Sequence, residues 1–98
     1  MTRIVRVRPE AEHDVEAAYA WYDEQRLALG REFLKELDVV YQRLTEFPLI
    51  YAEIYRGLRR ARLRRFPVGV FYLVTEAEVR VLAVVHVARN PKVWRSRR

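Results

Sequence analysis

Between Pro9 and Pro48 the apolar residues recur with a period of about 3.6 residues, and after Pro48 the period changes to two. Before Pro48, two stretches carry apolar residues at the i, i+4, i+7 spacing of a helix with one buried face. After Pro48, apolar and charged residues alternate, which is typical of strands. The chain is therefore predicted to adopt an α+β fold, with a helical part followed by a mainly stranded part.

The helical part is predicted to be a hairpin of two helices that follows a short strand at residues 3–8, where the sequence reads RIVRVR. Pro9 suits the first turn of a helix, and acidic residues follow it where the helix dipole favours them. The buried face of the first helix is predicted to contain Ala11, Val15, Ala18 and Tyr22. Gly30 is expected to supply the turn between the helices. The second helix is predicted to bury Phe33, Leu37, Val40, Leu44 and Phe47, and to end before Pro48.

Three strands are predicted to follow a loop at residues 48–55. In residues 58–65, Arg60, Arg62 and Arg64 alternate so that they share one face with Leu58. Residues 68–74 are apolar on both faces, as in a central strand, and residues 75–78 form a polar turn. The last strand, residues 79–87, is expected to direct Val79, Val81, Ala83, Val85 and Val87 to one face. The order β-α-α-β-β-β indicates a helical hairpin packed on one face of a small, mainly antiparallel sheet, with the other face partly open.

The length and composition narrow the class of protein. Ninety-eight residues are enough for one domain, residues 1–98, and leave no room for a second. The chain has no cysteine, and its two histidines, His13 and His86, stand far apart, so we expect no metal and no cofactor. The lack of cysteine also fits a reducing cytoplasm. The longest apolar run, residues 81–88, is too short to span a membrane, so we expect no membrane attachment.

The charge is unevenly distributed along the chain. Residues 1–53 carry 7 basic and 11 acidic side chains, whereas residues 54–98 carry 12 basic and 2 acidic ones. Such an asymmetry indicates an anionic partner, either nucleic acid or an acidic protein segment. The alternative is a basic surface that contacts only solvent.

Two motifs in the stranded part resemble a known family. One is Phe66-Pro67-x-x-Val70-x-Tyr72, within RRFPVGVFY, and the other is His86-x-x-Arg89-x-Pro91-x-x-Trp94, at the end of VLAVVHVARNPKVW. Together with the helical segments AEHDVEAAYAWYDEQ and LGREF, they resemble the ParE/RelE superfamily of small bacterial toxins over almost the whole chain, and in detail its ParE-like branch. The resemblance implies a toxin of a type II toxin–antitoxin module that a cognate antitoxin holds inactive in a hetero-oligomer.

The resemblance leaves two kinds of toxin to compare, a gyrase inhibitor and a ribosome-dependent mRNA endonuclease. Cleaving RNA through its 2′-OH requires a base, an acid and cations at the phosphate. The candidates for a nuclease site are Arg62, Arg64, His86 and Arg89, with Arg60 as a further cation. His86 is a suitable proton carrier. The resemblance implies that a nuclease member would carry a second one, a tyrosine or histidine close to the C-terminus, but the last aromatic residue here is Trp94. We therefore expect that the chain is not an enzyme, and the resemblance to the ParE-like branch implies that it binds DNA gyrase. A non-toxic module that grips nucleic-acid phosphates is a further alternative.

The residues expected to contact the target are Arg60, Arg62, Arg64, His86, Arg89 and Trp94. Tyr19 and Trp21, at the edge of the apolar stripe of the first helix, are expected to contact the antitoxin. Each assignment has a structural alternative. The three arginines would instead pair with acidic residues on the helices, His86 would bond to the backbone, and Trp94 would anchor the tail on the sheet.

Overall fold

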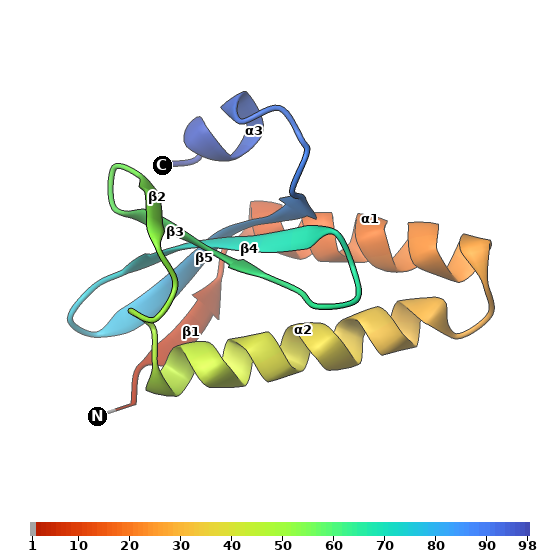
Figure 1. Ribbon diagram of the computed structural model, residues 1–98, viewed down its shortest axis with the longest axis horizontal. Coiled ribbons are helices and arrows are strands. Elements are labelled where there is room, and N and C mark those ends of the chain that lie inside the picture. The colour runs from red at the N-terminus through yellow and green to blue at the C-terminus, as the bar shows by residue number, and fades with distance from the viewer. Residues whose placement is uncertain (1) are drawn as a thin grey trace.

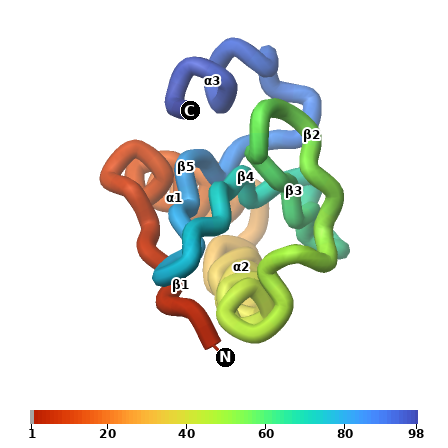
Figure 2. Tube along the Cα trace, turned by 90° about the vertical axis from the view of Figure 1, so that its left-hand side faces the viewer, coloured from red at the N-terminus to blue at the C-terminus, as the bar shows by residue number. Residues whose placement is uncertain are grey.

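The computed structural model describes residues 2–98, and it places two long helices and a short one on opposite faces of a five-stranded sheet (Figure 1). The elements are β1 (Ile4–Val7), α1 (Pro9–Gln25), α2 (Leu29–Glu46), β2 (Glu53–Tyr55), β3 (Leu58–Arg62), β4 (Val68–Val74), β5 (Glu78–His86) and α3 (Lys92–Arg95). The hairpin of α1 and α2 covers one face, and α3 lies over the other (Figure 2). The predicted fold class is confirmed, and α3 covers part of the face that was expected to be open.

The strand order in the sheet is β1-β5-β4-β3-β2. The pairs β2–β3, β3–β4 and β4–β5 are antiparallel, whereas β1 runs parallel to β5, with Ile4 opposite Glu78. The central strand β4 is buried on both faces at residues 68–72, as its unbroken apolar sequence predicts. The sheet therefore joins the two ends of the sequence.

The helices follow the predicted periodicity, with one difference between them. Pro9 is the first residue of α1, and the acidic first turn follows it. The buried residues of α2 are Gly30, Phe33, Leu37, Val40 and Leu44. By contrast, only Ala11 of α1 is fully buried, and Val15, Ala18 and Tyr22 are half-buried. The helix α1 therefore keeps part of its apolar stripe accessible.

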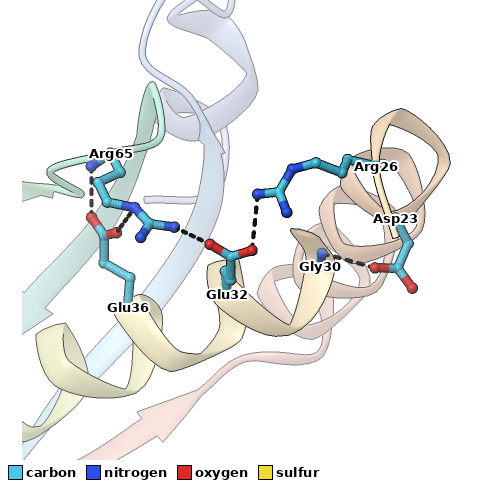
Figure 3. A network of polar contacts seen from close by, with 6 residues as sticks. All are labelled: Asp23, Arg26, Gly30, Glu32, Glu36 and Arg65. Carbon is cyan, nitrogen blue, oxygen red and sulfur yellow. Dashed lines mark hydrogen bonds and ion pairs between the residues drawn. The ribbon is translucent and has the colours of Figure 1, made fainter. Parts of the chain in front are cut away.

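The turn between the helices is not made by Gly30, so this prediction was wrong. Ala28 adopts the left-handed conformation, with a φ of 68°. Gly30 lies in the first turn of α2, where a Cβ atom would come within 2.8 Å of both the ring and the carbonyl oxygen of Tyr19. The Asp23 carboxylate accepts the Gly30 N–H at 2.8 Å (Figure 3). Glycine is required here for the close approach of the two helices and not for a turn.

The segment after α2 also differs from its prediction. The helix ends at Glu46, and Phe47 is 55 % exposed instead of buried. The segment predicted to be a loop contains β2, an edge strand that reaches β3 through a turn with positive φ at Arg56 and Gly57. An edge strand of three residues is too short to show a periodicity of its own.

The apolar side chains form two clusters, one on each face of the sheet. The larger lies between the sheet and the helical hairpin and includes Phe33, Leu44, Val70 and Tyr72. The smaller lies under α3 and consists of Leu58, Phe71, Leu82, Ala83, Val85 and Trp94.

The regular alternation predicted for the last strand is broken by a bulge. Phe71 of β4 pairs with Ala83, but the next residue, Tyr72, pairs with Val81, so Leu82 is an extra residue in β5. Val79 and Val81 face the helical hairpin, whereas Ala83 and Val85 belong to the cluster under α3. The prediction that these valines and Ala83 share one face was therefore wrong, since one inserted residue exchanges the two faces of a strand.

Candidate functional site

The bulge in β5 decides which face carries His86. His86 pairs with Val68, and directly opposite residues in an antiparallel pair point to the same face. Val68 belongs to the cluster beneath the helical hairpin. His86 therefore projects toward the side of the sheet that α1 covers.

At this end of β5 the surface is hollowed. A pocket of about 390 Å³ lies between α1 and β5, and its lining includes Trp21 and Tyr22 from α1, Val84 and His86 from β5, and Arg89 beyond it. The lining is mostly apolar, with a histidine and an arginine on the strand side. The structure thus brings Trp21, predicted to contact an antitoxin, together with His86 and Arg89, predicted to contact a target.

His86 is exposed and bonded to its own backbone neighbourhood. Its Nδ1 atom accepts the Ala88 N–H at 2.9 Å. Because Nδ1 acts as an acceptor, the proton of the neutral ring is on Nε2, which leaves Nε2–H to donate to a partner. His86 can therefore bond to the backbone through Nδ1, as in the structural alternative, and still bind a partner through its Nε2–H group.

Tyr19 and Trp21 lie on different sides of α1, because residues two apart on a helix do not face the same way. Trp21 is 57 % exposed and stands edge-on to Tyr22, with ring centroids 5.1 Å apart. Tyr19 lines a shallow depression between α1 and α2, together with Leu34. Only Trp21 belongs to the pocket beside β5.

The predicted arginine face is shorter than expected. Arg60 and Arg62 lie on β3 and share a face with Leu58, on the side that α3 covers. The strand ends at Arg62, so Arg64 is in the following loop. The stem of Arg60 lies within 3.0 Å of the position that a Cβ atom would take at Gly69. The arginine face therefore comprises Arg60 and Arg62 but not Arg64.

The helix carboxylates neutralise a different arginine. Arg65 donates to Glu32 at 2.7 Å and lies 3.7 Å from Glu36, and the Glu36 carboxylate also accepts the backbone N–H of Arg65 (Figure 3). The same carboxylate accepts the backbone N–H of Arg64. Glu32 binds Arg26 as well. Hydrogen bonds from Arg65, and then from Arg26, hold the pKa of Glu32 below its usual value. In residues 2–98, no acidic group lies within ion-pair distance of Arg60, Arg62, Arg64 or Arg89.

The candidate nuclease residues are divided between two faces of the sheet. Arg62 is opposite Gly69, which is in turn opposite Val85 in the cluster under α3, whereas His86 projects toward α1. Arg89 lines the same pocket as His86. The arrangement therefore gives two basic surfaces, not one site in which a proton carrier meets all the arginines.

Trp94 anchors the tail on the sheet. It is only 6 % exposed and stacks on Phe71, with ring centroids 4.8 Å apart and an interplanar angle of 18°. This arrangement agrees with the alternative in which Trp94 is an anchor. Because Trp94 is buried, it can contribute to a binding surface only indirectly, by holding α3 in place.

Asp14 was not singled out from the sequence, although it joins three parts of the site. Its carboxylate accepts the Val84 N–H at 3.0 Å and binds Arg97 at 2.5 Å, and Arg97 also donates to the Leu82 carbonyl at 3.0 Å. These bonds satisfy backbone groups beside the bulge. The sequence does contain an indication of this role, because Asp14 is an acidic residue on the predicted buried stripe of the first helix. It lies three residues after Ala11 and four before Ala18.

Other kinds of site find no support in the part of the chain that the structure describes. Among residues 2–98, no group of three or more histidine, cysteine or acidic side chains is arranged to hold a metal ion. No described helix has both the length and the apolar character needed to cross a membrane.

Known proteins resemble this chain in sequence and in structure. Residues 5–91 match the family described as "ParE toxin of type II toxin-antitoxin system, parDE". The toxin named ParE2 of Mycobacterium tuberculosis, found in two strains, is 32 % identical over 92 residues, which cover 93 % of this chain and 88 % of the relative.

Solved structures of toxin–antitoxin systems share the fold. A chain of the chromosomal ParDE system of P. aeruginosa superposes with a TM-score of 0.78 at 18 % identity, covering 88 % of this chain and 97 % of that one. A chain of the RelBE2 complex of Mycobacterium tuberculosis gives 0.63 at 18 % identity, with 88 % and 99 % covered. A chain of the E. coli DinJ–YafQ complex gives 0.60 at 16 % identity, with 90 % and 96 % covered. The match over residues 5–91 and the 32 % identity to a ParE toxin lead to one conclusion: this chain belongs to the ParE family of toxins of type II toxin–antitoxin systems.

Proposed function

We propose that this toxin arrests growth in the cytoplasm by binding DNA gyrase, and that it does so without cleaving a substrate itself. The observation that carries the proposal is the division of the basic residues between two faces of the sheet. A nuclease needs a proton carrier and cations around one phosphate, whereas His86 and Arg62 project to opposite faces. Binding a large protein partner has no such requirement, because an interface extends over many residues.

The target contacts that we propose are Arg60 and Arg62 on one face, Arg64 in the loop after β3, and His86 and Arg89 on the other face, with Trp94 holding the tail on the sheet. The arginines on this surface have no carboxylate partner in residues 2–98, so their charge is available to an acidic surface. Trp94 is buried, so its part is to keep α3 against Phe71.

We propose that a cognate antitoxin binds along α1, at Tyr19 and Trp21. The pocket between α1 and β5 offers an apolar lining for an anchoring side chain, and Arg89 at its border suits an acidic residue of the antitoxin. The ParDE, RelBE2 and DinJ–YafQ structures with this fold come from toxin–antitoxin systems. Trp21→Ala is expected to weaken the complex, because an exposed aromatic residue beside a pocket is typical of an interface hot spot.

The deciding experiment compares gyrase inhibition with RNA cleavage. The chain, released from its antitoxin and refolded, is expected to block supercoiling of relaxed plasmid by purified gyrase and to leave ribosome-bound mRNA intact. Arg62→Gln is expected to reduce the inhibition without loss of thermal stability, since an exposed charge contributes under about 1 kcal/mol to folding. Arg31→Gln, which removes one exposed arginine from α2, is the matched control.

The opposite result would assign the chain to the ribosome. Codon-dependent mRNA cleavage that disappears in His86→Ala, with gyrase unaffected, would contradict the proposal. It would make His86 the acid or base of an mRNA endonuclease.

A further inference from the structure

Three arginines gather where the turn between β2 and β3 meets α3, close to the end of the described chain (Figures 1 and 2). The guanidinium carbon of Arg95 lies 4.8 Å from the centre of the Tyr55 ring, and that of Arg56 lies 5.4 Å from it. Arg98 donates its Nε–H to the Arg56 carbonyl at 2.6 Å. We call Arg56, Arg95 and Arg98 the turn arginines. None of them belongs to the target or antitoxin contacts proposed above.

In the part of the chain that the structure describes, no acidic group neutralises the charge of the turn arginines. In residues 2–98, acidic groups bind Arg6, Arg26, Arg65, Arg80 and Arg97, but none lies within ion-pair distance of the turn arginines. Among the described residues, no hydrogen bond uses the guanidinium groups of Arg56 or Arg95. Each guanidinium offers five N–H donors in a planar fork. The cluster thus combines concentrated positive charge with free donors.

The backbone at Arg56 is a second, independent observation. Its φ of 43° places it in the left-handed region, where a residue with a Cβ atom is less stable than glycine by about 1–2 kcal/mol. The Arg98 side chain holds this turn through its bond to the Arg56 carbonyl. The chain therefore keeps an arginine at a strained position, where its charge adds to that of Arg95.

We propose that the turn arginines bind the phosphate groups of a nucleic-acid backbone. The planar guanidinium fork matches the geometry of a phosphate, and a row of phosphates can engage several arginines at once. Arg60 and Arg62 lie on the face of the sheet that α3 covers, so this face carries further arginines besides the turn arginines. The inference goes beyond the proposed inhibition of gyrase, which requires protein contacts only.

The same geometry predicts that the binding has little dependence on base sequence. Arg56 and Arg95 lie over the ring of Tyr55, and Trp94 is buried against Phe71. Neither ring is free to stack on a base, so the backbone is the part of the nucleic acid that this site recognises.

The test measures binding of the refolded full chain to fluorescent probes as a function of salt. The probes are a DNA duplex of about 20 base pairs, which is about two helical turns, an RNA strand of the same length, and polyglutamate. The triple variant Arg56→Gly, Arg95→Gln, Arg98→Gln is compared with Arg8→Gln, Arg31→Gln, Lys35→Gln, which removes three exposed charges elsewhere. The slope of log K against log salt is negative, and each lost phosphate contact reduces its magnitude by about one unit. The triple variant is therefore expected to have a slope smaller in magnitude by about three units. The control variant is expected to keep the wild-type slope.

Arg56→Gly on its own separates binding from folding. Glycine fits the left-handed conformation at this position, so the variant is expected to keep or raise the melting temperature while it loses about one unit of slope. The ratio of DNA to RNA affinity identifies which backbone the site prefers, and either preference supports the proposal.

Three results would overturn the proposal. They are equal slopes for the triple variant and its control, no binding of the wild-type chain to either nucleic acid, and tighter binding of polyglutamate than of DNA at the same salt. The last result would assign the turn arginines to an acidic protein segment instead.

Discussion

Replacing Asp14 by alanine is expected to destabilise the fold more than any other exchange of a single charged residue on α1. The Asp14 carboxylate accepts hydrogen bonds from Val84 N–H at 3.0 Å and from Arg97 at 2.5 and 3.3 Å. Only 13 % of the Asp14 side chain and 21 % of the Arg97 side chain are exposed. One carboxylate thus ties α1, the bulge in β5 and the tail together.

The magnitude follows from what the substitution leaves behind. Removing one partner of a buried ion pair destabilises a protein by about 3–5 kcal/mol, and an unsatisfied buried N–H by about 1–3 kcal/mol. Because Arg97 keeps some contact with water, we expect the lower part of this range, about 3 kcal/mol in total for Asp14→Ala. A loss of 1 kcal/mol lowers the melting temperature of a domain of this size by about 4–8 °C, so a drop of about 12–24 °C is expected.

Urea and thermal unfolding, followed by circular dichroism, measure this loss. Asp14→Asn keeps an acceptor for the Val84 N–H but loses the charge, so an intermediate effect of about 1–2 kcal/mol is expected. Glu16→Ala is the control: its side chain is 76 % exposed and its neighbour is His13, so a change within about 0.5 kcal/mol is expected. A double-mutant cycle with Arg97→Ala is expected to give a coupling above about 1 kcal/mol.

The reasoning would be refuted by an Asp14→Ala variant within about 1 kcal/mol of the wild type. Additive effects in the cycle with Arg97→Ala would also refute it, because they would show that the two side chains do not act together.

Four further results are expected. Gly30→Ala is expected to lower the melting temperature, because the new methyl group would lie 2.8 Å from the Tyr19 carbonyl oxygen, whereas Ala28→Gly is expected to raise it by relieving a positive φ. Glu32 has a lower pKa in the folded chain than its usual 4.5, so its contribution to stability is present above pH 4.5 and is lost as the pH falls through the folded pKa; Glu32→Gln is expected to flatten the acid side of a plot of urea midpoint against pH. Burial raises the pKa of Tyr72 from 10.0 to about 12, so its contribution is present below pH 10.0 and is lost as the pH rises toward 12; Tyr72→Phe is expected to flatten the alkaline side of the same plot.

The elements with a long, regular pattern could be predicted from the sequence. The faces of α1 and α2, the start of α1 at Pro9 and the central position of β4 follow from apolar spacing and from one proline. The local sequence was sufficient to predict these elements, because each apolar pattern extends over several helical turns or strand residues. The burial of Trp94 agrees with the alternative in which it anchors the tail, since the tail has no other large apolar group to bury, whereas its expected contact with the target stays a prediction.

The errors occurred where one residue changes the outcome. The extra residue Leu82 inverts the facing of the rest of β5, and no local pattern in VLAVVHV marks the inversion. Gly30 was assigned to a turn because glycine favours turns, whereas the structure needs it opposite Tyr19 in a neighbouring helix. The predicted facing of His86 in the candidate site was wrong for the same reason, because the face of the sheet that carries His86 depends on the bulge.

The parallel pairing of β1 with β5 has a consequence for the order in which the chain can fold. Ile4–Val7 pair with Glu78–Val81, so the first strand has no partner until most of the chain has been synthesised. Contacts between such distant segments close a large loop and form late. A chain that ends at Val74 lacks β5 and leaves the apolar faces of β1 and α1 uncovered, and its backbone amides are expected to exchange hydrogen as fast as those of an unfolded peptide. An unfinished copy is therefore expected to remain unfolded, and the toxin fold is expected to form only when the last strand has left the exit tunnel.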